Sequence, residues 1–184
     1  MWKSFCRWVL YDLLGWVKSV TVLTPDKCII CLAPHTSNWD FVIGQLFAGA
    51  EGLKANFLMK EEWFFWPLGF FFKHLGGIPV CRSKHTNMTD QLAETAKKSK
   101  SFRLCITPEG TRALTADWKK GFYYIALKAN IPIILYGIDY EVRNIGCTKK
   151  IIPNGDIEEQ MREIKQHYLK YKGLHPEKFT IGDV

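Results

Sequence analysis

The chain has 184 residues, of which 47% are hydrophobic and 23% charged, which is typical of a globular domain with its own core and unlike a disordered or fibrous chain. Its net charge of +7 and pI near 9.1 suit an anionic partner such as nucleic acid, an acidic membrane or a phosphorylated substrate. Seven Trp and twelve Phe cluster in two blocks and do not alternate with Lys and Arg, which favours a membrane surface and disfavours nucleic acid.

Residues 1–20 are predicted to form an N-terminal amphipathic helix, ahead of a single domain at residues 21–184. Its apolar side chains recur at helical spacing and are Trp2, Phe5, Val9, Leu13, Trp16 and Val20. Asp12 interrupts a run that is already too short to span a bilayer, and no small-residue cleavage site of a signal peptide follows it. Two interpretations fit: a helix lying in the plane of a membrane, or one packed on the domain's own core.

The next segment carries a candidate proton acceptor. Residues 27–32 are an apolar run of strand length, Pro34 turns the chain, and a helix is predicted from about Trp39 to Ala50. His35 and Asp40, separated by four residues, lie between strand and helix. An imidazole with one nitrogen held by a carboxylate keeps the other nitrogen as a base near working pH. One His and one Asp at this spacing also arise by coincidence, so motifs further along the chain are needed to show whether this pair is functional.

An aromatic block follows the second predicted strand, residues 54–59, which ends before Lys60. Ten consecutive uncharged residues, 63–72, are too few to cross a membrane, and Pro67 and Gly69 break any long helix. The block is expected to be ordinary core, or else the wall of a tunnel for an acyl chain or a membrane-facing surface.

The remaining pattern alternates strands and helices. Strands are predicted at 77–81, 102–106, 131–139 and 149–153, and helices at 87–98, 117–130 and 156–171. This order predicts an α/β fold: a single domain with a mainly parallel central sheet flanked by helices. Ligands of such sheets bind at the carboxyl ends of the strands. His35, Lys60, Arg82 and residues 107–112 each follow a strand, so they are expected on one rim.

The six cysteines do not indicate a disulfide framework, because four of them lie inside apolar strand-like runs. A reduced, cytoplasmic chain is the simpler interpretation. Cys28 and Cys31 form a CxxC pair, but residues three apart on a strand point to opposite faces, and no second Cys or His pair completes a tetrahedral set. No metal is therefore expected.

Four segments together resemble a known family. HX4D at residues 35–40, GGIPVCR at 76–82, PEGTR at 108–112 and IPIILYGID at 131–139 follow one another in the order of the motifs of the glycerolipid acyltransferases. The chain resembles a small member of the 1-acylglycerol-3-phosphate acyltransferase family over residues 29–139. The resemblance implies transfer of a fatty acyl group from acyl-CoA or acyl carrier protein to the hydroxyl of a lysophospholipid, by default 1-acylglycerol-3-phosphate to give phosphatidic acid. It implies no cofactor beyond that co-substrate, and peripheral attachment at the cytoplasmic face of a membrane.

The resemblance also assigns roles to residues. His35 is the expected base and Asp40 its partner, and the expected substrate-binding residues are Lys60, Arg82, Glu109, Gly110, Thr111 and Arg112. Lys60 and the two arginines match family positions that bind the acceptor's phosphate. For Glu109 the alternative is an ion pair with Arg112 or Arg82 that shapes the loop. Ser37 as a nucleophile is disfavoured, and it is expected to hydrogen-bond within the turn.

The sequence departs from the family pattern at three places. Thr107 replaces an apolar residue before PEG, Pro79 lies in the second motif, and the fourth motif keeps only Pro132. These changes leave the acceptor open to another lysophospholipid or an amino-acid-based lipid. Two other classes also stay open: a non-catalytic membrane-associated lipid-binding protein of the same fold, and a basic nucleic-acid-binding domain, for which no recognition motif is present.

Overall fold

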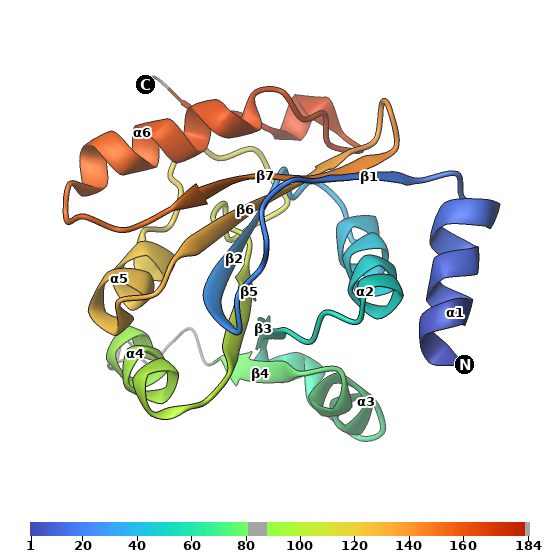
Figure 1. The fold of residues 1–184 in the computed structure, drawn as a ribbon, viewed down its shortest axis with the longest axis horizontal. Helices are drawn as coiled ribbons and strands as arrows, with labels where there is room; N and C mark the ends of the chain where they lie inside the picture. The colour runs from blue at the N-terminus through green and yellow to red at the C-terminus, as the bar shows by residue number, and fades with distance from the viewer. Residues whose placement is uncertain (81–87, 183–184) are drawn as a thin grey trace.

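A mainly parallel sheet forms the centre of the computed structural model, which describes residues 1–80 and 88–182 (Figure 1). The strands are β1 (Val17–Val20), β2 (Lys27–Ala33), β3 (Asn56–Lys60), β4 (Gly77–Val80), β5 (Phe102–Ile106), β6 (Ile133–Asp139) and β7 (Asn144–Ile151). Within the described residues they form one seven-stranded sheet in the order β1-β7-β6-β2-β5-β3-β4. All neighbouring pairs are parallel except β6 and β7. The predicted α/β class is confirmed.

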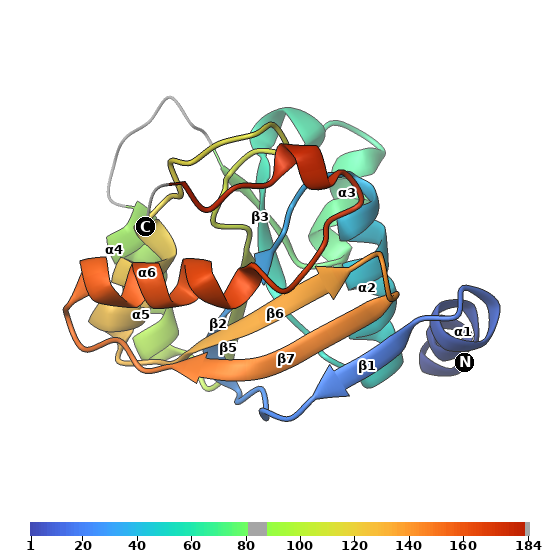
Figure 2. The same cartoon turned by 90° about the horizontal axis from the view of Figure 1, so that it is seen from above.

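Helices cover both faces of this sheet (Figures 1 and 2). The α-helices are α1 (Trp2–Arg7), α2 (Trp39–Glu51), α3 (Leu68–His74), α4 (Met88–Lys98), α5 (Gly121–Ala129) and α6 (Ile157–Tyr168). Short helical turns are η1 (Trp8–Leu13), η2 (Glu61–Trp63) and η3 (Pro176–Lys178). Helices α4, α5 and α6 contribute to one core, whereas α1, η1 and α2 contribute to the other. The sheet therefore separates two apolar layers.

Strand β2 lies in the middle of the molecule and is buried on both faces. Ile29, Cys31 and Ala33 belong to the core beneath α4, α5 and α6, whereas Cys28 and Ile30 belong to the core beneath α2. A near-continuous apolar run is typical of a parallel strand covered on both sides. The thiols of the CxxC pair thus lie on opposite faces of the sheet, as their spacing predicts.

The N-terminal segment is helical over a shorter range than predicted. Helical turns end at Leu13, and the helix expected to reach residue 20 is wrong at its end, because β1 pairs with β7 through backbone hydrogen bonds (Figure 2). The β1 side chains are exposed, and Val20 continued the apparent helical spacing by sequence although its backbone pairs in the sheet.

One side of the N-terminal helical segment packs on α2, and the other side is open. Cys6 and Leu10 are fully buried. A Cβ atom at Gly49 of α2 would lie 2.6 Å from Cys6 Sγ, so only glycine permits this approach. Trp2, Phe5 and Trp8 are exposed. The segment packs on the domain core and still presents an apolar outer surface.

Most rings of the aromatic block lie at the surface. The exposed members are Trp63, Phe65, Trp66, Phe70 and Phe71, with Trp66 87% and Phe70 79% exposed. Ordinary core packing is therefore the wrong interpretation for these side chains, although Phe64 and Phe72 do contact each other and Phe72 contacts Phe41. Helix α3, which the sequence did not predict, begins just after Pro67. Among the described residues no helix is both long and apolar enough to cross a bilayer.

Several other boundaries also differ from the predictions, and two strands, β3 and β6, each begin two residues later than expected. The helix expected from Asp117 begins at Gly121, because Lys119 N donates to Pro108 O and Trp118 Nε1 donates to Thr180 O. The strand expected at 149–153 is β7, which begins earlier because it pairs antiparallel with β6. The helix expected to reach residue 171 ends at Tyr168.

Candidate active site

Several candidate residues follow strands that end on the same edge of the sheet. Strands β2, β3, β5 and β6 are all parallel. His35 follows β2, Lys60 ends β3, the loop at 107–112 follows β5, and Tyr140 follows β6. The predicted convergence of His35, Lys60 and the PEGTR loop on one rim is present in the fold.

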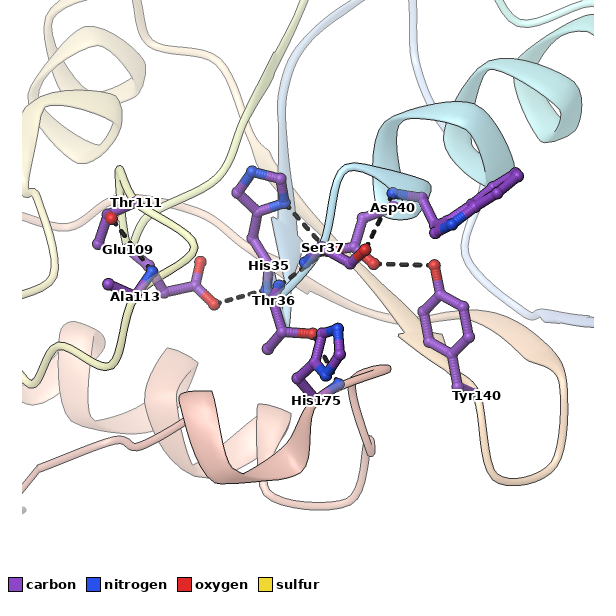
Figure 3. Close-up of polar contacts among 10 residues, drawn as sticks. His35, Thr36, Ser37, Asp40, Glu109, Thr111, Ala113, Tyr140 and His175 are labelled. Carbon is purple, nitrogen blue, oxygen red and sulfur yellow. Dashed lines mark hydrogen bonds and ion pairs between the residues drawn. The ribbon is translucent and has the colours of Figure 1, made fainter.

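Asp40 is the most densely bonded group at this rim. It lies in the first turn of α2, and its side chain is 1% exposed. Its Oδ2 is 3.1 Å from His35 Nδ1 and accepts hydrogen bonds from Thr36 N at 2.8 Å and Ser37 N at 2.9 Å. Its Oδ1 accepts from the Tyr140 hydroxyl at 2.8 Å (Figure 3). An oxygen that already accepts two N–H groups requires a donor at His35 Nδ1 as well.

The His35 ring is therefore oriented for proton transfer. With a proton on Nδ1, the neutral ring carries its free lone pair on Nε2, which has no hydrogen-bond partner among the described residues. The side chain is 20% exposed, so this nitrogen is not sealed in the core. Figure 3 shows the second ring nitrogen turned away from Asp40. The pair has the geometry of a general base and its orienting carboxylate.

Glu109 supports the His35 loop from the other side. Its Oε1 accepts a hydrogen bond from His35 N at 2.8 Å, and the residue is 5% exposed (Figure 3). Burial raises the pKa of Glu109 to about 7, although hydrogen bonds from backbone N–H groups oppose that shift. Its buried Oε2 has no partner among the described residues. The alternative ion pair between Glu109 and Arg112 is absent from the described contacts, and a backbone amide takes its place.

The expected anion-binding side chains are less constrained. Arg112 and Thr111 are exposed, and Arg112 has no ion pair with another described residue. Lys60 Nζ is 3.8 Å from Glu62, and both side chains are largely exposed. Strand β5 lies between β2 and β3, so Lys60 is about 10 Å across the sheet from the end of β2 at ordinary strand spacing. Arg82 lies outside the described residues.

The loop that carries these groups is itself fixed. Gly110 has φ +65°, a left-handed conformation that favours glycine, and Gly110 N donates to Thr107 O. Lys119 N donates to Pro108 O at 2.7 Å, which ties the loop to the segment before α5. The backbone of the PEGTR loop is therefore held while the Arg112 side chain extends into solvent.

Sequence reasoning missed two groups that hold the HX4D turn. Tyr140 directly follows β6 and donates to Asp40, so the rule about carboxyl ends of parallel strands would have found it. Thr36 is buried, and its Oγ1 accepts from His175 N at 3.2 Å in the C-terminal segment. No feature of the sequence predicts the contact between Thr36 and His175. Ser37 Oγ hydrogen-bonds within the turn as predicted, but it accepts from Trp39 N and not from the expected Asn38 or Thr36.

Comparisons with known proteins concern the family and the fold. A family model described as Acyltransferase matches residues 17–138. Among solved structures, the fold is similar to the crystal structure of the 1-acyl-sn-glycerophosphate (LPA) acyltransferase PlsC from Thermotoga maritima, with a TM-score of 0.61 and 17% sequence identity over 93% of this chain and 80% of that one. At that identity the likeness shows the fold alone. No curated protein sequence matches.

Proposed function

The chain belongs to the acyltransferase family, and on that premise we propose that it transfers a fatty acyl group from a thioester to the free hydroxyl of a lysophospholipid. The default acceptor is 1-acylglycerol-3-phosphate, and the donor is acyl-CoA or acyl carrier protein. The observation that carries the proposal is the His35 and Asp40 pair, with Nε2 unpaired among the described residues, on the rim that also bears the PEGTR loop.

The chemistry proceeds without a covalent enzyme intermediate. His35 Nε2 accepts the proton of the acceptor hydroxyl while the hydroxyl oxygen bonds to the thioester carbonyl carbon. Asp40 stabilises the resulting imidazolium. When the tetrahedral intermediate collapses, the carbon–sulfur bond breaks and the imidazolium returns the proton to the departing thiolate. The products are the ester and a free thiol, and His35 is again neutral.

Recognition of the acceptor rests on the cationic side chains of the rim. A guanidinium matches two phosphate oxygens at once, and an ammonium adds a point charge. The absence of an ion pair for Arg112 within the described residues leaves its fork for the acceptor's phosphate, with Lys60 farther along the edge. Arg82 shares this role in the proposal by its place in the second motif. The remaining proposed acceptor-binding residues are Glu109, Gly110 and Thr111.

We further propose peripheral attachment to the cytoplasmic face of a membrane through exposed aromatic side chains. The outer face of α1 and the aromatic block supply them, and rings with neighbouring cationic side chains partition to lipid interfaces. Replacing Trp66 and Phe70 with Ser should weaken binding to anionic phospholipid vesicles by about tenfold or more, because two rings that would insert into the lipid are lost. The control variant combines Leu169→Ser and Ile152→Ser, which remove two exposed apolar side chains outside the aromatic block. Equal vesicle binding by both variants would contradict this attachment.

The test of the activity is thiol release by the purified protein. Acyl-CoA and acyl carrier protein are each supplied with and without a panel of lysolipids, including lysophosphatidic acid and amino-acid-based acceptors. Release that depends on a phosphorylated lysolipid supports the proposal. Release without any acceptor would indicate a thioesterase, and no release with any acceptor would favour the non-catalytic lipid-binding alternative.

A further inference from the structure

We propose that Tyr140 is a positioning residue for the catalytic pair, acting through Asp40, and that Trp16 holds the Tyr140 ring in place. This inference rests on the proposed acyl transfer. It connects the N-terminal segment of the chain to the base, although 19 sequence positions separate Trp16 from His35 and 105 separate His35 from Tyr140.

The first step is the hydrogen bond to Asp40. The Tyr140 hydroxyl is the sole donor to Asp40 Oδ1 within the described residues, at 2.8 Å, whereas Oδ2 serves His35 and two backbone amides. A carboxylate bonded only through one oxygen can turn about its own axis, and a donor on the second oxygen prevents that. Burial and the Asp40 charge raise the pKa of Tyr140 above its usual range, so the hydroxyl remains a donor.

The second step is what holds Tyr140. Its backbone N donates to Lys172 O at 2.8 Å, which fixes the main chain. Its ring meets Trp16 edge to face, with centroids 5.1 Å apart and planes at 85°. This geometry is favourable for aromatic pairs. Trp16 is itself buried, and its N donates to Leu10 O, so the N-terminal segment presents the ring at a fixed place.

The third step is the electrostatic effect on the base. A hydrogen bond to a carboxylate stabilises its charge and so weakens its pull on a neighbouring imidazolium. Loss of the Tyr140 hydroxyl should therefore strengthen the attraction between the Asp40 carboxylate and a protonated His35 ring. Among the described residues, the ionisable groups near the pair are Glu109 after β5, His175 beside Thr36, and the Lys172–Glu141 ion pair at the β6–β7 turn. None of these is altered by removing the Tyr140 hydroxyl.

The decisive variant is Tyr140→Phe, which keeps the ring and its contact with Trp16. We expect kcat to fall about 5–20-fold with the acceptor's KM within twofold, because one hydrogen bond to a charged group is lost away from the substrate. The acid limb of the pH–rate profile should move up by about 0.5 pH unit, since the carboxylate then holds the imidazolium more strongly. An unchanged profile and kcat would overturn the proposal, as would a change confined to KM.

Tyr136→Phe is the matched control. Tyr136 lies on β6, the strand that Tyr140 follows, is buried, and its hydroxyl shares a 2.7 Å hydrogen bond with Thr24 Oγ1. Its loss should lower stability by about 1 kcal/mol, as a typical hydrogen bond does, and leave the pH–rate profile unmoved. The same profile shift in both variants would mean that Tyr140 acts only through stability, which would overturn the positioning role.

Trp16→Leu tests the connection to the N-terminal segment. We expect a shift in the same direction as in Tyr140→Phe and no further shift when the two changes are combined, because the hydrogen bond is then already lost. Additive shifts would show that Trp16 does not act through Tyr140. Trp16→Phe, which retains an aromatic edge, should restore the wild-type profile if Trp16→Leu folds poorly.

NMR titration of the His35 ring in the free protein separates this inference from the proposed reaction. The His35 signal is assigned by its loss in His35→Ala. Its titration midpoint should rise in Tyr140→Phe by about the 0.5 pH unit expected in the kinetics and stay fixed in Tyr136→Phe. A rise without turnover on any lysolipid would leave the positioning role standing and refute the acyl transfer. A fixed midpoint would refute the positioning role.

Discussion

The two halves of the rim are built differently. Around Asp40, four donors and buried packing fix the HX4D turn before any substrate arrives. On the proposed acceptor side, Arg112 is exposed without an ion pair, and the ion pair of Lys60 with Glu62 is long, both within the described part of the chain. A base must be oriented in advance to be effective, whereas an anion-binding side chain must keep its donors available. We infer that the fold preorganises the chemistry and leaves the phosphate-binding groups to be ordered by the acceptor.

The largest expected effect comes from removing the base. His35→Ala should lower kcat by about 10²–10⁴-fold, the usual contribution of a general base, with the acceptor's KM little changed. Thiol release from the acyl donor measures it. Because His35 N donates to Glu109 through the backbone, the fold should survive, which circular dichroism and thermal unfolding will check. Activity equal to that of the wild type would contradict the proposed role of His35 as general base.

The second effect tests the acceptor side. Arg112→Ala should raise the acceptor's KM by about 30–100-fold, corresponding to the loss of a bidentate charge-assisted contact, while kcat falls far less. Arg112→Lys should recover part of the affinity, because a point charge remains. Arg162→Ala, at an exposed position on α6, is the control. A loss in kcat with normal KM would mean that Arg112 acts in the chemical step and not in acceptor binding, which would contradict the division of the rim into two functional halves.

The third effect is a pH dependence of stability caused by Glu109, which belongs to the PEGTR loop and accepts a hydrogen bond from His35 N on the other half of the rim. Its pKa is raised from 4.5 to about 7, so between these values the folded protein binds more protons than the unfolded chain. The free energy of unfolding should therefore fall as pH rises from about 4.5 to 8, by about 3 kcal/mol from this residue. Glu109→Gln, which keeps an oxygen acceptor for His35 N, should lack that decline.

Urea unfolding at pH 5 and pH 8 measures the difference between this variant and the wild type. The advantage of Glu109→Gln should grow with pH, whereas Glu62→Gln, at an exposed carboxylate, should show no such growth. A constant difference across this window would mean that Glu109 is ionised at both pH values, and the loop would then contain a buried charge.

Local pattern and resemblance predicted much of the molecule. The bounds of β5 were predicted in full, β2 and α2 were missed by one residue each, and the contact between His35 and Asp40 is present. In each case the signal is contained in a short stretch: an apolar strand, a helix start, a five-residue spacing. The family membership implied by the motif order is confirmed.

The failures share a cause in long-range contacts. Strand β1 exists because β7 lies beside it, more than 120 positions later in the chain. Nothing in the sequence indicated that Glu109 accepts from the backbone amide of His35, because every residue other than proline has the same backbone N–H donor. Tyr140 bonds to Asp40 across 100 positions of the chain, and only its place directly after β6 hints at that contact. Residues 117–120 have helix-forming neighbours, yet contacts with Pro108 and Thr180 prevent them from forming a helix.

The position of β1 has a practical consequence for anyone shortening this chain to improve its solubility. Removing residues 1–20 as though they were a detachable anchor would strip a strand from β7, and an uncovered strand edge invites intermolecular pairing. The truncated protein would also lack Trp16, Cys6 and Leu10, leaving one face of α2 bare. Any change in vesicle binding by such a protein would be confounded with aggregation, so surface substitutions at Trp2, Phe5 and Trp8 are the cleaner test of the proposed membrane attachment.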